Sequence, residues 1–342
     1  MGLDYQFVLW NKHKKTYDKI IVFSMLSYII LFAVVTLIFN SETSIETLVI
    51  RTFGSLAIIM LNIILVIGPL ARLNSNFLPI LYNRRHLGVS MFIAALIHGG
   101  FSMFQFHALG DVNPVYSVFT SNMDYGSLVN FPFQVLGFLA LLILFIMAST
   151  SHDFFLSNLS AVVWKRLHMM VYLAYALIIA HVFLGAFQQE TSPFTIGILV
   201  VGFIIIASLH LITAFRESKI DNAKTLEIEE WLKVCDINEI EEDRAKIFTV
   251  GNERVAIFKY DGKLSAINNV CKHQGGPLGE GKVIDGCITC PWHGYQYLPH
   301  NGQSPPPFTE KVSTYDVKLD GNIVYINPIA YEEGTEVKPC NY

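Results

Sequence analysis

The sequence predicts a membrane α-helical bundle of six transmembrane helices, followed by a C-terminal all-β domain. Six long apolar segments occupy residues 20–215, and each is near the ~20 residues that a helix needs to cross a bilayer. Residues 228–342 have an ordinary soluble composition and contain short runs rich in β-branched and aromatic residues. Two pairs of cysteine and histidine lie in this second part, at Cys271, His273, Cys290 and His293.

The composition of the whole chain favours a membrane protein. Hydrophobic residues make up 52% of the 342 residues, charged residues only 15%, and the mean hydropathy is +0.44. These values are too apolar for a soluble protein, so the lipid bilayer is an expected partner. The net charge of −4 and the lack of a basic stripe argue against a nucleic-acid partner.

The apolar segments contain no Asp, Glu, Lys or Arg. They are Ile20–Phe39, Thr52–Ala71, His86–His107, Phe131–Ser149, Leu167–Phe187 and Phe194–Phe215. In lipid, backbone polar groups must be satisfied within the segment, so these segments are expected to be helices. A buried soluble core would rarely need six such runs.

Lysine and arginine gather at alternate connections between the segments, which predicts the orientation. These residues are Lys12, Lys14, Lys15, Lys19, Arg72, Arg84, Arg85, Lys165, Arg166, Arg216, Lys219 and Lys224. The opposite connections contain none, with Arg51 alone near their border. The positive-inside rule therefore predicts a multi-pass protein of the cytoplasmic (inner) membrane. Residues 1–19 form a cytoplasmic arm, and both termini and the β domain are cytoplasmic.

Histidines are the only ionisable residues within the predicted spans, and ionisable residues in a membrane mark functional sites. The third and fifth spans run in the same direction, and His86 and His168 both start near the cytoplasmic surface. His98 lies twelve residues beyond His86, and His181 thirteen beyond His168, which is about 18 and 20 Å along a helix. Depth therefore pairs His86 with His168 and His98 with His181.

Imidazoles paired across a bundle are what a bis-histidine haem needs. Steps of twelve or thirteen residues do not return to the same face of an ideal helix, so tilt or a local bulge would have to absorb the difference. His107 and His210 are reserve candidates, and each is expected to be a packing or hydrogen-bonding histidine.

The residues around these histidines resemble the ferric reductase-like transmembrane domain family. The resemblance rests on RRxLG at residues 84–88 and WxxLHxxxY at residues 164–172. Within that family, the layout is similar to the haem-binding membrane subunit of the bacterial methionine-sulfoxide reductase system. The resemblance implies haem b and marks His98, His168 and His181 as ligands. That subunit usually lacks a histidine at the position of His86, so His86 is either an interfacial side chain, leaving one bis-histidine haem, or the fourth ligand of two haems.

A polar linker at residues 216–227 precedes the β-rich part. Its expected strands are Trp231–Ile237, Lys246–Val250, Glu253–Tyr260 and Leu264–Asn268, with turns at Gly251-Asn252 and Asp261-Gly262. Two loops then follow, CxH at residues 271–273 and CxxH at residues 290–293, and each supplies one cysteine and one histidine. Such a set can hold zinc or the two irons of a [2Fe–2S] cluster.

The flanking sequence decides between the two metals. QGGPL at residues 274–278, Gly294 and PPP at residues 305–307 closely resemble the Rieske family, in particular the ferredoxin-type members that serve bacterial oxygenases. Zinc sites seldom show this flanking sequence, and small residues let backbone N–H groups approach the sulfides. The resemblance implies a Rieske [2Fe–2S] cluster held by Cys271, His273, Cys290 and His293.

Departures from the high-potential Rieske proteins predict the redox range. Gly276 and Trp292 stand where those proteins carry disulfide cysteines, and Tyr295 replaces a serine that hydrogen-bonds the cluster. Hydrogen bonds to sulfur raise the potential, so we expect the lower part of the range of about −150 to +300 mV. By the same resemblance, Tyr297 could donate one hydrogen bond to a ligand sulfur. Cys287 is expected to be a buried strand cysteine rather than a fifth ligand.

The two halves together predict an electron-transfer oxidoreductase or a subunit of one. No GxGxxG fingerprint follows the sixth span, and about 115 residues leave no space for a dinucleotide fold. We expect electrons to pass from a cytoplasmic flavoprotein or ferredoxin through the cluster and the haems to a quinone or another acceptor in the membrane or on its outer side. The alternative is a membrane-tethered ferredoxin that serves a cytoplasmic oxygenase.

Overall fold

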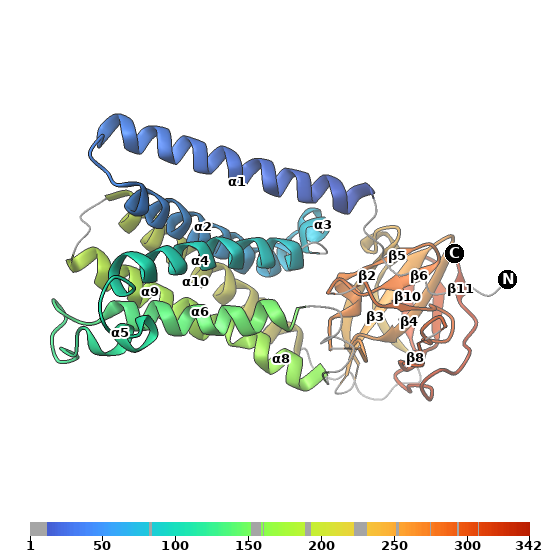
Figure 1. Cartoon of the computed structure of the whole chain (residues 1–342). Coiled ribbons are helices and arrows are strands. Elements are labelled where there is room, and N and C mark those ends of the chain that lie inside the picture. The colour runs from blue at the N-terminus through green and yellow to red at the C-terminus, as the bar shows by residue number, and fades with distance from the viewer. Residues whose placement is uncertain are drawn as a thin grey trace. The chain divides into compact units, whose positions relative to one another are not determined.

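The computed structural model describes residues 12–81, 84–151, 159, 161–188, 193–221, 231–250, 253–273, 275–292, 294–306 and 308–342. Within them the chain forms two compact units (Figure 1). One unit contains residues 69–81 and 211–342, and the other contains residues 12–68 and 84–210. The first includes all the described β-strands, and the second is helical.

Six apolar helices account for the predicted spans. They are α1 (Lys12–Phe39), α2 (Ile45–Leu73), α4 (Arg84–His107), α6 (Phe133–Ser149), α9 (Val171–Gln188) and α10 (Pro193–Asp221). Short helices connect them: η1 (Ser75–Phe77), α3 (Leu78–Leu81), α5 (Pro114–Thr120) and α8 (Ala161–Met169).

The membrane bundle is confirmed, with a refined number of spans. Among the described residues, five helical stretches are long and apolar enough to cross a membrane. The segment predicted as the fourth span is helix α6, which is apolar but has only 17 residues. At 1.5 Å per residue it is about 26 Å long, slightly less than a bilayer core of about 30 Å.

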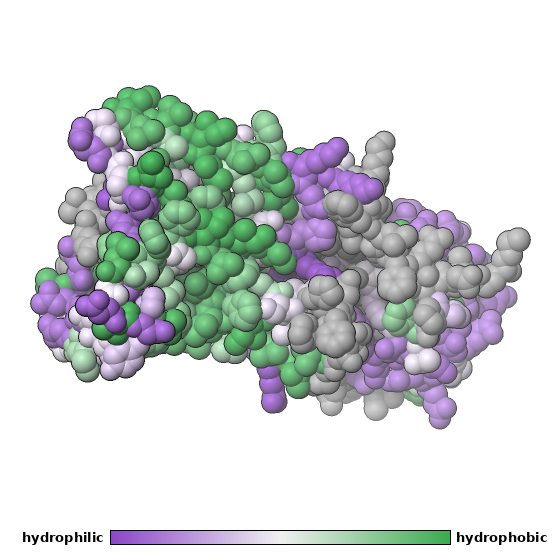
Figure 2. All heavy atoms as spheres, viewed as in Figure 1, coloured by the Kyte–Doolittle hydropathy of each residue, from purple (hydrophilic) through white to green (hydrophobic). Residues whose placement is uncertain are grey.

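The outer surface of the helices is strongly apolar (Figure 2). Large side chains such as Phe23, Leu31, Ile38 and Phe203 are mostly exposed. A soluble protein rarely leaves such an extensive apolar surface in water, whereas lipid tails would cover it. The multi-pass membrane character therefore follows from both the sequence and the structure.

The predicted fifth span is interrupted at Met170, between α8 and α9. The Met170 N–H donates to Leu167 O at 3.1 Å, and the Ala174 N–H donates to Met170 O at 2.9 Å. The first of these bonds is the short i→i−3 type, which tightens the turn without leaving the backbone unsatisfied. This local irregularity lies between His168 and His181.

In the described residues the C-terminal domain contains three antiparallel sheets, which confirms the all-β prediction. Their strand orders are β1-β10-β9, β11-β4-β3-β2 with β8 paired to β4, and β5-β6-β7. The strands are β1 (Leu232–Asp236), β2 (Arg244–Val250), β3 (Glu253–Tyr260), β4 (Lys263–Asn268), β5 (Lys282–Ile284), β6 (Cys287–Thr289), β7 (Gln296–Tyr297), β8 (Thr314–Tyr315), β9 (Val317–Asp320), β10 (Ile323–Ile326) and β11 (Cys340–Asn341).

Strand β3 lies between two hydrophobic cores. Val255 and Ile257 pack into one core, while Ala256 and Phe258 pack into the other, and all four are fully buried. Alternate side chains of a strand point to opposite faces, so this continuous apolar run fits a strand covered on both sides. The expected turn at Asp261-Gly262 is confirmed, with positive φ at both residues, as a two-residue hairpin requires. The other expected turn, Gly251-Asn252, lies outside the described residues.

Candidate metal centres

The two Cys/His loops share one backbone design. The Cys271 N–H donates to Gly276 O at 2.8 Å, and the Gly275 N–H donates to Cys271 O at 2.7 Å. In the second loop the Cys290 N–H donates to Tyr295 O at 2.7 Å, and the Gly294 N–H donates to Cys290 O at 3.0 Å.

Each of these loops reverses at a glycine with positive φ, 71° at Gly275 and 73° at Gly294. An L-residue side chain is disfavoured there. The matched pattern holds both cysteines at equivalent places in tight turns.

The two loops pack against each other. A Cβ atom at Gly276 would lie 2.8 Å from Cys290 Sγ and 3.1 Å from the Trp292 ring. Cys271 and Cys290 are only 2% and 1% exposed. The His273 ring stacks on Tyr295 with centroids 4.6 Å apart and planes within 5°.

Three of the four predicted cluster ligands, Cys271, His273 and Cys290, lie in these two packed loops. In a Rieske centre each iron takes two protein ligands, so two such loops would supply the set. The fourth predicted ligand, His293, lies outside the described residues. Cys287 lies buried in β6, as expected for a strand cysteine.

Tyr297 is fully buried beside the first ligand loop. Its hydroxyl oxygen accepts the Lys272 N–H at 3.0 Å and lies 3.4 Å from Cys271 Sγ. Burial, the largest cause, and the neighbouring Cys271 raise the pKa of Tyr297 well above its ordinary value. The hydroxyl therefore keeps its proton and can donate it toward the ligand sulfur.

Replacing Tyr297 with phenylalanine should lower the reduction potential of the cluster. A lost hydrogen bond of ~1 kcal/mol corresponds to about 40 mV for one electron. A redox titration followed by EPR would measure this shift. Tyr260→Phe is a matched control, because Tyr260 lies in the same core but bonds Ser265 Oγ at 2.8 Å. An equal shift in the control would rule out a specific role for Tyr297.

In the helical unit, His98 on α4 and His181 on α9 face each other. Their ring centroids are 6.2 Å apart and their planes make an angle of 78°. Two metal–imidazole bonds of about 2 Å, with about 1 Å from each nitrogen to its ring centre, give a separation of about 6 Å. The observed spacing therefore fits one iron between the two rings.

Backbone carbonyl groups fix the orientation of both rings. His98 Nδ1 lies 2.9 Å from Ile50 O, and His181 Nδ1 lies 2.9 Å from Phe133 O. A carbonyl only accepts, so each Nδ1 carries the proton and each Nε2 keeps a lone pair for a metal. Metal-bound histidines in proteins usually show this second hydrogen bond.

Both rings line a cavity of about 910 Å³ within the helical unit. Its wall includes residues of α1, α2, α4, α6 and α9, and the glycines Gly54 and Gly137. Cofactor pockets commonly measure about 300–1,000 Å³, so the cavity has a suitable size for haem. The cavity and the two imidazoles together fit a bis-histidine haem.

The other two predicted haem ligands, His86 and His168, do not face each other in this cavity and contact other side chains. His86 Nδ1 lies 2.6 Å from Asp18 Oδ1 on α1. His168 stacks on Trp164 with centroids 3.8 Å apart, and its Nε2 lies 3.3 Å from Thr150 Oγ1. Neither His86 nor His168 lines the cavity that contains His98.

The reserve histidines are engaged in hydrogen bonds. His107 lines the cavity, with Nδ1 3.0 Å from Ser117 Oγ. His210 Nδ1 lies 2.9 Å from Ile206 O, and its Nε2 lies 3.2 Å from the Tyr172 hydroxyl. Both nitrogens of His210 are thus occupied, which fits the expected hydrogen-bonding role.

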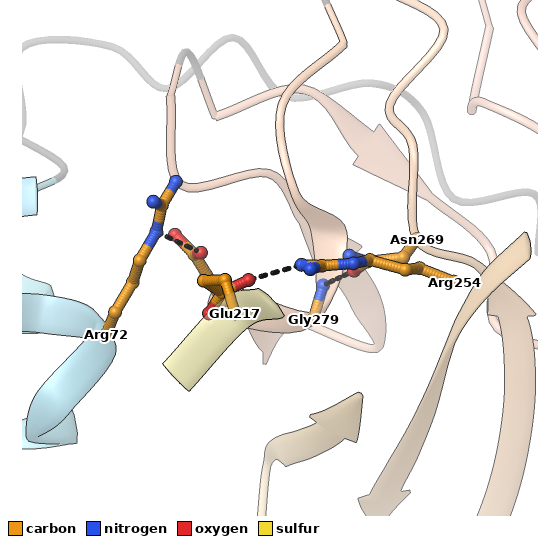
Figure 3. Close-up of polar contacts among 6 residues, drawn as sticks. Arg72, Glu217, Arg254, Asn269 and Gly279 are labelled. Carbon is orange, nitrogen blue, oxygen red and sulfur yellow. Dashed lines mark hydrogen bonds and ion pairs between the residues drawn. The ribbon is translucent and has the colours of Figure 1, made fainter. Parts of the chain in front are cut away.

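Figure 3 shows a network of two ion pairs, which lies next to Asn269 and Gly279 at the two ends of the first ligand loop. Arg72 Nε at the end of α2 donates to Glu280 Oε1 at 2.9 Å, and Arg254 on β3 donates to Glu217 on α10. Asn269 joins the two pairs, because its N–H donates to Arg254 O at 2.9 Å and its Oδ1 accepts the Gly279 N–H at 2.7 Å.

All the residues of this network belong to the first compact unit. The loop that carries Cys271 and His273 begins after Asn269 and ends at Gly279. Its two ends are therefore tied to the ends of α2 and α10.

Two groups of residues near these sites were not predicted from the sequence. The network joins charges up to 208 residues apart, and no sequence pattern indicates that pairing. Gly54 and Gly137, which lie against the facing histidines, could have been found. Each glycine precedes its histidine by 44 residues.

Comparison with known proteins agrees with both domains. Residues 230–316 match the Rieske [2Fe-2S] domain family, and residues 53–179 match the family described as ferric reductase like transmembrane component.

The β domain also resembles individual ferredoxins. The anthranilate 1,2-dioxygenase ferredoxin subunit of Burkholderia cepacia is 31% identical over 99 residues, covering 29% of this chain and 92% of the relative. The ferredoxin component of the alkene monooxygenase system of Xanthobacter autotrophicus is 29% identical over 111 residues, covering 32% and 85%. Among solved structures, the ferredoxin of carbazole 1,9a-dioxygenase from Nocardioides aromaticivorans IC177 is 23% identical, covering 30% and 100%, with a TM-score of 0.28.

The predicted family assignments are thus confirmed, while the narrower similarity to the methionine-sulfoxide reductase subunit stays a prediction. Through its C-terminal domain the chain belongs to the Rieske [2Fe–2S] family, joined here to a ferric reductase like transmembrane component.

Proposed function

We propose that this protein transfers electrons between a cytoplasmic donor protein and an acceptor in the membrane or on its outer side. In this proposal Cys271, His273, Cys290 and His293 hold the [2Fe–2S] cluster, and His98 and His181 hold a haem b. The observation that carries the proposal is the pair of facing imidazoles, 6.2 Å apart, in a chain that also contains a Rieske domain.

The protein supplies a preorganised site for each group. Ile50 O and Phe133 O hold the two imidazoles with their protons on Nδ1, so both rings present Nε2 without rearrangement. When bound, both cofactors exchange single electrons. Mostly apolar side chains line the cavity around His98 and His181, and Cys271 and Cys290 are buried in their loops.

The partners follow from this one-electron chemistry. A single cluster cannot accept a hydride, so NAD(P)H must act through a separate flavoprotein or ferredoxin. The expected low potential of the cluster favours electron flow from the cytoplasm outward, and a quinone is one acceptor that would fit. The side assignment rests on the lysine and arginine distribution, which favours a cytoplasmic Rieske domain in the inner membrane of the cell.

The proposal also includes a second haem, which His86 and His168 would hold. Asp18 beside His86 Nδ1 is compatible with this role, since a carboxylate often orients a metal-bound histidine through its second nitrogen. The depth match of the two residues supports it as well.

The alternative function is a membrane-tethered ferredoxin for a cytoplasmic oxygenase. It is favoured by the relatives, which are ferredoxin components of dioxygenase and monooxygenase systems. An anchor, however, does not require two carbonyl-oriented histidines facing each other in a cavity of about 910 Å³.

A redox titration of the purified full-length protein, followed by optical and EPR spectroscopy, distinguishes the two functions. The electron-transfer proposal expects a low-spin haem spectrum together with a Rieske EPR signal, and it expects reduction of the cluster to be followed by reduction of the haem. A cluster signal without any pyridine haemochrome would eliminate electron transfer through the bundle and leave the tethered ferredoxin.

A further inference from the structure

The two facing histidines sit in two copies of the same local arrangement. Each histidine contacts a backbone carbonyl 48 residues earlier in the chain, Ile50 for His98 and Phe133 for His181. A glycine follows each of these carbonyl residues by four positions, Gly54 on α2 and Gly137 on α6. Corresponding residues of the two copies are 83 positions apart in every case.

A third pair of residues extends the repeat. Gln105 and Gln188 each follow the histidine of their copy by seven positions, and they too are 83 residues apart. Gln105 Nε2 donates to Thr47 Oγ1 at 3.4 Å, and Gln188 Nε2 donates to Phe131 O at 2.8 Å. Each glutamine therefore ties its helix to the region where the partner helix begins.

The glycines lie directly against the imidazole rings. A Cβ atom at Gly54 would be 2.8 Å from His98 Nδ1, and one at Gly137 would be 2.8 Å from His181 Nδ1 and Cε1. Real Cβ atoms essentially never approach so closely, so a methyl group at either position must displace something. Each imidazole is already fixed at Nδ1 by a carbonyl, and bound iron would fix Nε2 as well.

Helix geometry explains why glycine is needed four residues after the carbonyl. Residues i and i+4 lie one above the other on the same face of a helix. A ring that donates Nδ1–H to the carbonyl at position i must therefore lie over position i+4. Glycine inside a helix costs about 1 kcal/mol relative to alanine, so its presence at both matched positions calls for a compensating gain.

We infer that Gly54 and Gly137 are positioning residues for the haem, and that its iron lies between two halves of an internal repeat. The inference rests on the proposed function, because it assumes a haem between His98 and His181. Each half supplies one carbonyl, one glycine and one histidine. Alanine at either glycine pushes the ring away from its carbonyl or moves Nε2 off the iron axis.

The test compares Gly54→Ala and Gly137→Ala in the full-length protein. Loss of an outer contact to a metal ligand typically weakens metal binding by 10–100-fold, and we expect haem loss to apomyoglobin to accelerate by a similar factor. We also expect changed g-values of the low-spin haem signal, which general destabilisation would not produce. Both variants should change in the same way, because the two positions are equivalent.

Two glycines on other helices of the bundle provide matched controls. Gly100→Ala on α4 meets nothing within 4 Å and should leave the haem signal unchanged. Gly202→Ala on α10 would place its methyl group against Asn62 Nδ2, so it creates a steric clash that does not involve an imidazole. Spectra recorded in isolated membranes and normalised to the cluster EPR signal avoid any selection of variants by purification.

Each outcome has a separate meaning. Wild-type protein without haem would overturn the proposed function and this inference with it. Wild-type protein with haem, together with unchanged g-values and unchanged haem loss in Gly54→Ala and Gly137→Ala, would overturn the inference alone. An equal change in Gly202→Ala would also overturn it, because the effect would then be one of general packing.

Discussion

Replacing either His98 or His181 with alanine should abolish the haem that we propose between α4 and α9 and leave the Rieske cluster intact. The two rings are 6.2 Å apart, and each is fixed at Nδ1 by a backbone carbonyl. Loss of one ring would remove one of the two imidazoles that would hold the haem. We expect the low-spin haem signal to disappear from both variants, as measured by optical and EPR spectroscopy.

His210→Ala is the appropriate control for this experiment. Its imidazole lies on α10 and contacts Ile206 O and the Tyr172 hydroxyl instead of the cavity. The haem content of this variant should equal that of the wild type. Retention of the full low-spin signal in His98→Ala would contradict the assignment of this residue as a ligand.

The variant His86→Ala tests whether the protein holds one haem or two. If His86 and His168 hold a second haem, His86→Ala should reduce the haem content by half while the His98/His181 signal remains. If His86 only pairs with Asp18, the haem content should not change. The same comparison with His168→Ala shows whether both residues belong to one site.

The difference between the two histidine pairs shows what depth along a helix can and cannot predict. Depth alone pairs His98 with His181, and the structure places these rings opposite each other, with centroids 6.2 Å apart. Depth also pairs His86 with His168, whose rings lie against Asp18 and Trp164 in the structure, and this pairing stays a prediction. Twelve residues of an ideal helix leave His86 roughly 120° around the axis from His98. Sequence depth carries no information about this rotation.

The β domain was more predictable than the contacts around it. The continuous apolar run of β3, which is buried on both faces, and the hairpin at Asp261-Gly262 follow from local residue preferences, which a sequence displays directly. The network of Arg72, Glu280, Arg254 and Glu217 depends on how distant segments pack. A sequence gives the charges of these residues but not their partners, so this part of the site required the structure.

Reversing the charge of Arg72 should destabilise the first ligand loop, because it breaks the ion pair with Glu280. The Glu280 side chain is only 15% exposed, so its carboxylate is mostly buried, whereas its partner Arg72 is 40% exposed. Leaving a mostly buried carboxylate without its partner costs about 1–3 kcal/mol. We expect Arg72→Glu to lower the melting temperature followed at the cluster absorbance, and Glu280→Arg to do the same.

The double variant Arg72→Glu/Glu280→Arg tests whether the effect belongs to this pair. It restores opposite charges, so it should recover part of the lost stability. Lys246→Glu is the control, because it breaks the exposed pair between Lys246 and Glu239, and we expect almost no change in melting temperature. Double-variant stability no better than the sum of the two single losses would show that Arg72 and Glu280 do not act together.

The pH dependence gives an independent test of the same contact. Burial, the largest cause, raises the pKa of Glu280 above its ordinary value of 4.5, while Arg72 acts in the opposite direction. A carboxyl group with a raised pKa in the folded state binds its proton more tightly there than in the unfolded chain. Stability from this group is therefore present at low pH and declines as the pH rises above 4.5. Arg72→Gln removes the opposing charge, so this decline should be larger and extend to higher pH than in the wild type. A pH profile of the melting temperature identical in the two proteins would mean that Arg72 does not stabilise the ionised Glu280.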